Sequence, residues 1–203
     1  MSAVPQSHVT YQEYLARERV AEFKNEYYQG EIFAMTGFTP EHNTANGNAF
    51  ACLYGRLQGG GCRIMNSAQR IRIPANGLAT YPDISVYCET PQRDEIDNDA
   101  FNNPRVIIEV LSKSTERYDR GVKFARYREL DSLLEYVLIS QSEPNVERFA
   151  RRDDGTWVLT VLQGMDAVLQ FESIEAELTL AEIYRDVDFE NVQDEEKPAA
   201  ENV

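Results

Sequence analysis

Two acidic residues lie inside segments whose apolar neighbours are typical of a buried β-sheet. Residues 82–87 (Pro-Asp-Ile-Ser-Val-Tyr) and 105–111 (Arg-Val-Ile-Ile-Glu-Val-Leu) each read as one strand, and they contain Asp83 and Glu109. An unpaired carboxylate buried in a sheet loses its hydration, which costs several kcal/mol. A chain carries such carboxylates when a cation, either a metal ion or a lysine, lies against them. This pair of strands therefore constrains both the fold and the function.

The alternation of side chains along the two strands places each acid on a defined face. Asp83 shares its face with Tyr87, and Glu109 shares its face with Ile107 and Leu111. If the two strands are neighbours, the two carboxylates converge at one edge of the sheet. Carboxylates held close together repel, which raises the pKa of one of them unless a cation lies between them. Mg²⁺ suits this place, because it prefers oxygen ligands and needs only one or two protein carboxylates.

The length and charge of the chain limit what kind of protein it can be. With 203 residues, it is expected to form one domain over residues 1–187, followed by an acidic, disordered tail over residues 188–203. The net charge of −14 does not favour non-specific binding to polyanions. The first residues carry no apolar signal segment, and no run approaches the roughly 18 apolar residues of a membrane span. We therefore expect a cytoplasmic protein without a membrane partner.

The cysteines suggest no disulfide and no metal site. Cys52, Cys62 and Cys88 are odd in number and contain no Cys-x-x-Cys pair. This pattern favours reduced, half-buried thiols in a reducing compartment.

The order of the predicted elements indicates an α/β sandwich built on a mixed sheet. The strand over 104–111, a helix and the strand over 134–140 form a βαβ unit, whose two strands are parallel. In chain order, the predicted elements are a helix over 11–21, a hairpin over 25–35, a helix over 40–57, strands over 62–66, 69–74, 81–88 and 104–111, a helix over 119–130, a strand over 134–140, a hairpin over 145–162 and a helix over 179–186.

The helix predicted over 119–130 is rich in basic residues. Lys123 lies one turn after Asp119, and a lysine near a metal-bound water can position that water or stabilise developing negative charge. Arg120 and Arg126 either contact the phosphates of a nucleic acid or pair with the many acids of the chain. The sequence favours neither alternative.

Two further residues have open interpretations. His42 lies near the start of the helix predicted over 40–57, where it either caps that helix or lines a cleft. Tyr127 lies four residues after Lys123, so it either orients the lysine or packs in the core.

The chain resembles the Uma-two family of restriction-endonuclease-like proteins, within the PD-(D/E)XK nuclease superfamily. The resemblance extends from Tyr11 to about Phe149. Its motifs are Pro82-Asp83, then Ile108-Glu109-Val110-Leu111-Ser112-x-Ser114-Thr115, then Asp119-Arg120-Gly121-x-Lys123-x-x-x-Tyr127.

The resemblance implies a restriction-endonuclease-like core, a mixed β-sheet flanked by helices, with an additional C-terminal β-hairpin. The implied activity is Mg²⁺-dependent hydrolysis of a DNA phosphodiester, with Mn²⁺ as a substitute ion. Asp83 and Glu109 match the metal-binding acids of the family, Glu26 matches its auxiliary acid, and Lys123 matches its active-site lysine.

One departure from the superfamily pattern leaves the lysine open. In the superfamily, a lysine lies two residues after the acid, and this chain has Leu111 there. Lys113 shares the strand alternation of Glu109 and is the alternative to Lys123.

Three functions remain open at this point: an endonuclease, a nuclease-fold module that binds or assembles without cleaving, and a hydrolase of a smaller phosphate ester. Cleavage of both strands of a duplex requires two sites, so a symmetric homodimer is expected. The strands predicted over 145–162 are the expected pairing surface.

Overall fold

The computed structural model describes residues 8–35 and 38–190. The tail predicted over residues 188–203 lies, from residue 191 on, outside the described residues. The elements are α1 (Tyr11–Glu18), β1 (Asn25–Tyr28), β2 (Glu31–Ala34), α2 (Pro40–Arg56), β3 (Arg63–Asn66), β4 (Arg70–Ile73), β5 (Leu78–Thr80), β6 (Ile84–Tyr87), β7 (Ala100–Phe101), β8 (Val106–Leu111), α3 (Glu116–Tyr118), η1 (Asp119–Lys123), α4 (Phe124–Tyr127), β9 (Glu135–Ser140), β10 (Asn145–Arg151), β11 (Trp157–Gln163), β12 (Val168–Phe171), β13 (Ala176–Thr179) and α5 (Leu180–Ile183).

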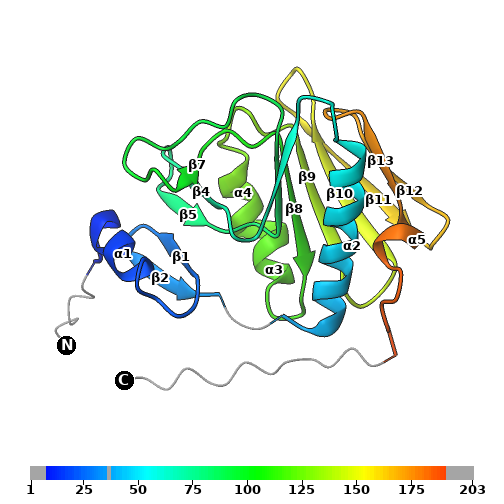
Figure 1. The fold of residues 1–203 in the computed structure, drawn as a ribbon, viewed down its shortest axis with the longest axis horizontal. Coiled ribbons are helices and arrows are strands. Elements are labelled where there is room, and N and C mark those ends of the chain that lie inside the picture. Colours follow the sequence, from blue (N-terminus) through cyan, green and yellow to red (C-terminus); the bar gives the residue numbers. More distant parts are fainter. Residues whose placement is uncertain (1–7, 36–37, 191–203) are drawn as a thin grey trace.

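A six-stranded mixed sheet forms the centre of the fold, in the order β11-β10-β9-β8-β6-β3. Figure 1 labels its strands β8 to β11. β8 and β9 are parallel, as the predicted βαβ unit requires, and the other pairs are antiparallel. The C-terminal hairpin of β10 and β11 extends one end of this sheet. The fold is therefore the predicted mixed sheet flanked by helices, with an additional hairpin.

The two faces of β8 are covered by different elements. Val106, Ile108 and Val110 pack in a core with α2 and α5. Ile107 and Leu111, which share the face of Glu109, pack in a second core with α4. The predicted alternation along this strand is confirmed, and Glu109 therefore faces α4.

A second sheet, in the order β2-β1-β5-β4-β7, lies beside the second core (Figure 1). The sequence predicts one strand over 81–88, whereas in the structure this segment forms a strand only over its second half, as β6, and a separate strand, β5, precedes it. Residues 81–83 lie between β5 and β6 and belong to neither strand. They include Pro82, which has no N–H for a strand ladder. The hairpin of β12 and β13 and the short β7 were also not predicted.

The helix predicted over 119–130 is not a regular α-helix. It consists of α3, a π-helical turn (η1) and α4, and it ends at Tyr127. Phe124 and Tyr127 bury their rings in the second core, which fixes the orientation of α4.

An aromatic cluster packs α4 against the C-terminal hairpin. The ring of Phe124 lies 4.5 Å from that of Phe149 and 5.2 Å, edge-to-face, from that of Trp157. Phe124 directly follows Lys123 in the chain. The hairpin therefore supports the helix that carries the predicted active-site lysine.

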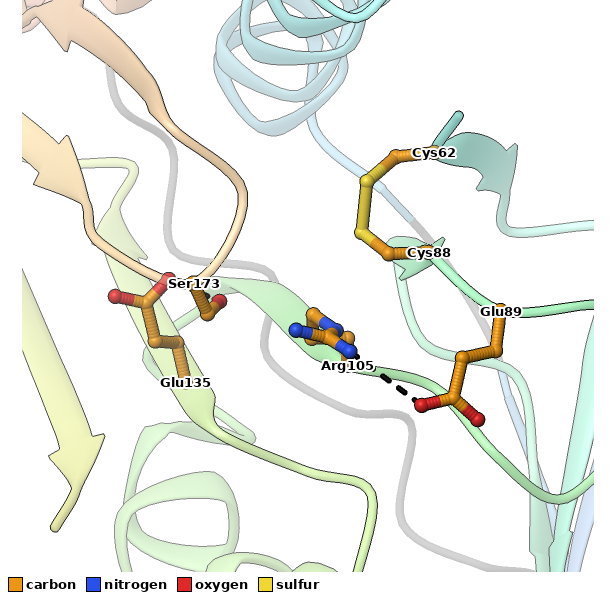
Figure 2. Close-up of a disulfide and its surroundings, with 6 residues drawn as sticks. All are labelled: Cys62, Cys88, Glu89, Arg105, Glu135 and Ser173. Carbon is orange, nitrogen blue, oxygen red and sulfur yellow. Dashed lines mark hydrogen bonds and ion pairs between the residues drawn. A yellow bond between two sulfur atoms is a disulfide. The ribbon is translucent and has the colours of Figure 1, made fainter. Parts of the chain in front are cut away.

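Cys62 and Cys88 form a disulfide, so the expectation of three reduced thiols is wrong (Figure 2). β3 and β6 are antiparallel with Arg63 opposite Tyr87, and the next step of this register places Cys62 opposite Cys88. The bond joins the outermost strand β3 to its neighbour, while Cys52 is free. Within the described residues, no helix is long and apolar enough to cross a bilayer.

Candidate active site

Asp83 and Glu109 lie side by side at the centre of the large sheet. β6 and β8 are neighbours with Ile84 opposite Ile108, so the next step places Asp83 opposite Glu109. The Asp83 N–H donates to Glu109 Oε2 over 3.3 Å, and the Val110 N–H donates to Asp83 Oδ2 over 2.8 Å. Both side chains are buried. The two acids thus meet as predicted, but between two interior strands rather than at the lateral edge of the sheet, and Asp83 lies directly before β6 rather than within it.

Lys123 is the lysine of this site. Its Nζ lies 2.8 Å from Glu109 Oε1 and 3.3 Å from Asp119 Oδ1. The Tyr127 hydroxyl donates to the same Glu109 Oε1 over 2.7 Å, and its ring packs in the second core, so Tyr127 fills both predicted roles. Lys113, by contrast, is exposed. The cation that pairs with Glu109 is therefore a lysine. Arg105, at the start of the same predicted strand, does not pair with Glu109 but with Glu89, over 3.5 Å (Figure 2).

Glu26 reaches the same site from β1. It is buried, and it accepts hydrogen bonds from the hydroxyls of Thr80, over 2.7 Å, and Tyr118. Arg126 Nη1 lies 3.8 Å from Glu26 Oε1. Thr80 and Tyr118 were not predicted. The signal for Tyr118 was its spacing of eight residues from Arg126, two helical turns, and its hydroxyl accepts from Arg126 over 2.7 Å.

The two arginines predicted to bind nucleic acid differ in position. Arg126 lines the cavity described below and stacks on Tyr28, with Cζ 3.3 Å from the ring centroid. Arg120 does not line that cavity. Its guanidinium lies 2.6 Å from Glu116 and 3.1 Å from Glu147. Of the two predicted alternatives, ion pairing therefore describes Arg120.

A cavity of about 300 Å³ collects the predicted residues. Its wall mixes charged groups with exposed aromatic side chains, of which Phe33 and Phe38 are 46% and 48% exposed. The lining includes Glu26, Asp83, Glu109, Lys123 and Arg126, together with His42, Tyr118 and Asp119. Four of the five predicted site residues among them, Glu26, Asp83, Glu109 and Lys123, have buried ionisable side chains.

Burial dominates the electrostatics of the site. Burial, followed by the charge of Glu109, raises the pKa of Asp83 to about 8. Burial also raises the pKa of Glu109, although the Lys123 ammonium opposes this. Burial lowers the pKa of Lys123, but the charges of Glu109 and Asp119 outweigh it and hold that pKa well above its usual range. One lysine therefore does not fully compensate the acids around it, and either a bound proton or a further cation would do so.

His42 lines the cavity with its side chain. The capping bond at the start of α2 involves the backbone of His42 and not its ring: the His42 N–H donates to Oγ1 of the N-cap residue Thr39 over 3.2 Å. Its Nε2 lies 3.4 Å from Asp83 Oδ2. Burial lowers the pKa of His42 to about 4, so the imidazole is neutral near pH 7. Of the two predicted alternatives, the structure favours the cleft.

The donor set suits a hard divalent ion. Residues 8–35 and 38–190 contain no ready-made cluster of three or more His, Cys, Asp or Glu side chains around one point. Mg²⁺ and Mn²⁺ do not need one, since one or two carboxylates and several waters satisfy them. Asp83 and Glu109 supply two carboxylates whose raised pKa values indicate incomplete compensation.

Comparison with known protein families gives a match over most of the chain. Residues 11–182 match the Uma2 family, described as "Putative restriction endonuclease".

Two relatives come from Synechocystis sp. "Uncharacterized protein slr1290" is 35% identical over 178 residues, covering 88% of this chain and 92% of that protein. "Uncharacterized protein sll1609" is 36% identical over 163 residues, covering 80% and 92%.

A solved structure has the same fold. A crystal structure from Anabaena variabilis, described as "a putative nuclease belonging to DUF820", superposes with a TM-score of 0.71 and covers 87% of this chain and 97% of its own. Its sequence identity is 18%, so this likeness concerns the fold alone.

Proposed function

The chain belongs to the Uma2 family, and from this premise we propose that it is a metal-dependent endonuclease that hydrolyses DNA phosphodiester bonds. The observation that carries the proposal is the contact of Lys123 Nζ with Glu109, 2.8 Å away, beside the directly opposed Asp83. Two acids and a lysine around one cavity are the groups that phosphodiester hydrolysis needs.

Asp83 and Glu109 would hold the divalent ion, Mg²⁺ with Mn²⁺ as a substitute. When bound, the ion polarises the scissile phosphate and lowers the pKa of a water molecule. Tyr127 fixes the Glu109 carboxylate through its hydroxyl, which donates to Oε1 over 2.7 Å. The second oxygen, Oε2, accepts the Asp83 N–H over 3.3 Å and would also contact the ion.

Lys123 orients the attacking water and stabilises the negative charge that develops on the phosphate. Its ammonium remains charged because Glu109 and Asp119 raise its pKa. Glu26 assists directly or through a water, from a position fixed by Thr80 and Tyr118.

A plasmid-nicking assay with Mg²⁺ tests the reaction. Glu109→Gln keeps the size of the side chain and removes its charge. We expect a loss of about three orders of magnitude in the cleavage rate, comparable to the loss of a preorganised electrostatic contact. Chelation by EDTA should abolish wild-type cleavage, and Mn²⁺ should restore it. Equal cleavage by the wild type and Glu109→Gln would overturn the proposal.

DNA binding is proposed to depend on Arg126 rather than on Arg120. Arg126 lines the cavity, whereas Arg120 is paired with Glu116 and Glu147. Fluorescence anisotropy with a labelled duplex in Ca²⁺ should show that Arg126→Gln weakens binding about tenfold and reduces the salt slope by about one. Arg120→Gln is the matched control, and an equal loss in both variants would contradict this assignment.

One observation favours a second candidate, a nuclease-fold module that binds without cleaving. Leu111 occupies the place, two residues after Glu109, where the superfamily has its lysine. Binding of the duplex with no cleavage in any of Mg²⁺, Mn²⁺ or Co²⁺ would support this candidate.

A further inference from the structure

We infer that His42 is a third protein ligand of the metal site, and that its nitrogen gives the site a preference for Mn²⁺ and later transition ions over Mg²⁺. Because residues 8–35 and 38–190 contain no ready-made group of three such ligands, the carboxylates would close on the ion, beside His42, only when it binds. This inference rests on the proposed function, because it places His42 beside the ion that Asp83 and Glu109 would hold. It adds a residue and an ion preference that the carboxylates alone do not provide.

Both ring nitrogens of His42 are buried without a hydrogen-bond partner in the described part of the chain. The residue is only 3% exposed, yet it lines the cavity. Buried polar atoms without partners are rare in folded proteins, and each one calls for an explanation. Nε2 comes within 3.4 Å of Asp83 Oδ2, but the two groups do not have the geometry of a hydrogen bond.

The separation of these two atoms suits a shared ion. Nitrogen and oxygen ligands lie about 2.1 Å from Mn²⁺, Mg²⁺ or Zn²⁺. Two neighbouring ligands of an octahedral ion such as Mg²⁺ or Mn²⁺ are therefore about 3.0 Å from each other, and two ligands of a tetrahedral ion such as Zn²⁺ are about 3.4 Å apart. The observed distance of 3.4 Å from Nε2 to Oδ2 matches the tetrahedral spacing, and it exceeds the octahedral spacing by only about 0.4 Å.

The ring is held in this orientation by its neighbours. Phe38 stacks on the imidazole with a centroid distance of 4.5 Å and an interplanar angle of 25°. The backbone of His42 is fixed in the first turn of α2, whose N-cap is Thr39. A preorganised ring favours coordination because little freedom remains to be lost on binding.

The kind of ligand determines which ion is preferred. Carboxylates suit Mg²⁺, Ca²⁺ and Mn²⁺, whereas an imidazole suits the transition metals. A site of two carboxylates and one imidazole therefore binds Mn²⁺ and Co²⁺ better, relative to Mg²⁺, than a site of two carboxylates alone.

The chain offers a matched control, because it contains only two histidines, His8 and His42. Electron spin-echo measurements on the Mn²⁺-loaded full chain detect imidazole nitrogen bound to the ion. We expect nitrogen modulation in the wild type and in His8→Ala, and none in His42→Asn. Modulation that persists in His42→Asn, or that is absent from the wild type with Mn²⁺ bound, would overturn the inference.

Calorimetric titration gives an independent readout. His42→Asn should weaken Mn²⁺ binding about tenfold or more, and Mg²⁺ binding by less than about threefold, since the Asn oxygen remains a ligand for a hard ion. A circular dichroism spectrum should show that the variant is folded. An equal loss for both ions would overturn the inference.

The two proposals fail in different ways. If Mn²⁺ binds the wild type but not Asp83→Ala, and no nitrogen modulation is seen, the metal site stands and only the role of His42 falls. If Mn²⁺ does not bind the wild type at all, both proposals fall.

Discussion

At Asp83, burial and a neighbouring like charge raise the pKa together. The pKa is about 8 in the fold and 3.8 ordinarily, so between these values the folded chain binds a proton that the unfolded chain has lost. This contribution to stability is present at low pH and is lost as the pH rises towards 8. His42 acts oppositely, because its pKa, lowered from 6.5 to about 4, makes stability rise with pH in that window.

Between about pH 4 and 6.5, the two residues change the free energy of unfolding in opposite directions and largely offset each other. Above about pH 6.5, only the destabilising change from Asp83 remains. We expect the free energy of unfolding to fall by about 2 kcal/mol between about pH 6.5 and 8, at about 1.4 kcal/mol per pKa unit. The raised pKa of Glu109 acts in the same direction. Asp83→Asn should remove most of this fall, because its amide cannot ionise while its oxygen still accepts the Val110 N–H. Urea denaturation in EDTA at several pH values measures it, and an unchanged slope in the variant would contradict the assignment.

Lys123 has a structural consequence besides its proposed role in cleavage. Lys123→Met leaves Glu109 and Asp119 buried without their cation, so we expect a loss of about 3 kcal/mol in the free energy of unfolding, together with the loss of cleavage. Lys113→Met alters an exposed side chain and should change neither by a measurable amount. Urea denaturation and plasmid nicking measure both, and loss of cleavage in Lys113→Met alone would reverse the choice of lysine.

The proximity of Asp83 and Glu109 could be predicted from single residues, because strand alternation and one neighbour relation are enough to bring them together. The contacts of His42 with Asp83 and of Tyr118 with Glu26 could not, since each joins separate elements whose packing the sequence does not reveal. A histidine in the first turn of a helix carries no signal for the carboxylate it will meet.

At the scale of elements, the disulfide fastens the outermost strand β3 to β6. Cys62 and Cys88 are separated by 26 positions, and closing a loop of that size contributes about 3 to 4 kcal/mol in the chain-entropy account. Reduction with dithiothreitol should lower the free energy of unfolding by about that amount, and Cys52→Ser should not. Two reactive thiols on Cys62 and Cys88 in the untreated protein would contradict the pairing.

The disulfide and the π-helical turn show where sequence patterns stop being informative. The odd number of cysteines gives no sign that two of them form a disulfide, and only the register of β3 and β6 shows which two are opposite each other. Similarly, Asp119, Lys123 and Tyr127 follow one another every four residues, a spacing that a regular helix satisfies as well as η1 followed by α4. The spacing of these residues therefore cannot reveal the π-helical turn η1, although such turns are frequent at functional sites.

At the scale of the whole molecule, the proposed homodimer has a candidate surface on β11, the outer strand of the large sheet. Leu159 and Val161 share one face there and are 48% and 50% exposed. We expect sedimentation velocity to show a dimer for the wild type and a monomer for Val161→Lys, because a buried lysine without a partner opposes association. Thr160→Lys, on the other face of the strand, should remain dimeric. A wild-type monomer would exclude this arrangement.

The overall architecture could largely be predicted, because long apolar strands and the βαβ unit specify the central sheet. The second sheet could not, since β5 and β7 have three and two residues and carry too little alternation to be recognised. Glu26 lies on the predicted hairpin over 25–35, but its place in the cavity depends on the unpredicted β5, which pairs with β1 and carries Thr80.

The packing of Trp157 on Phe124 gives the protein a built-in optical reporter. The chain has one tryptophan, and its indole touches the residue that follows Lys123. Emission from this single fluorophore therefore senses the seating of α4 against the hairpin, without any label. Changes at the lysine can be followed by light in the unmodified chain.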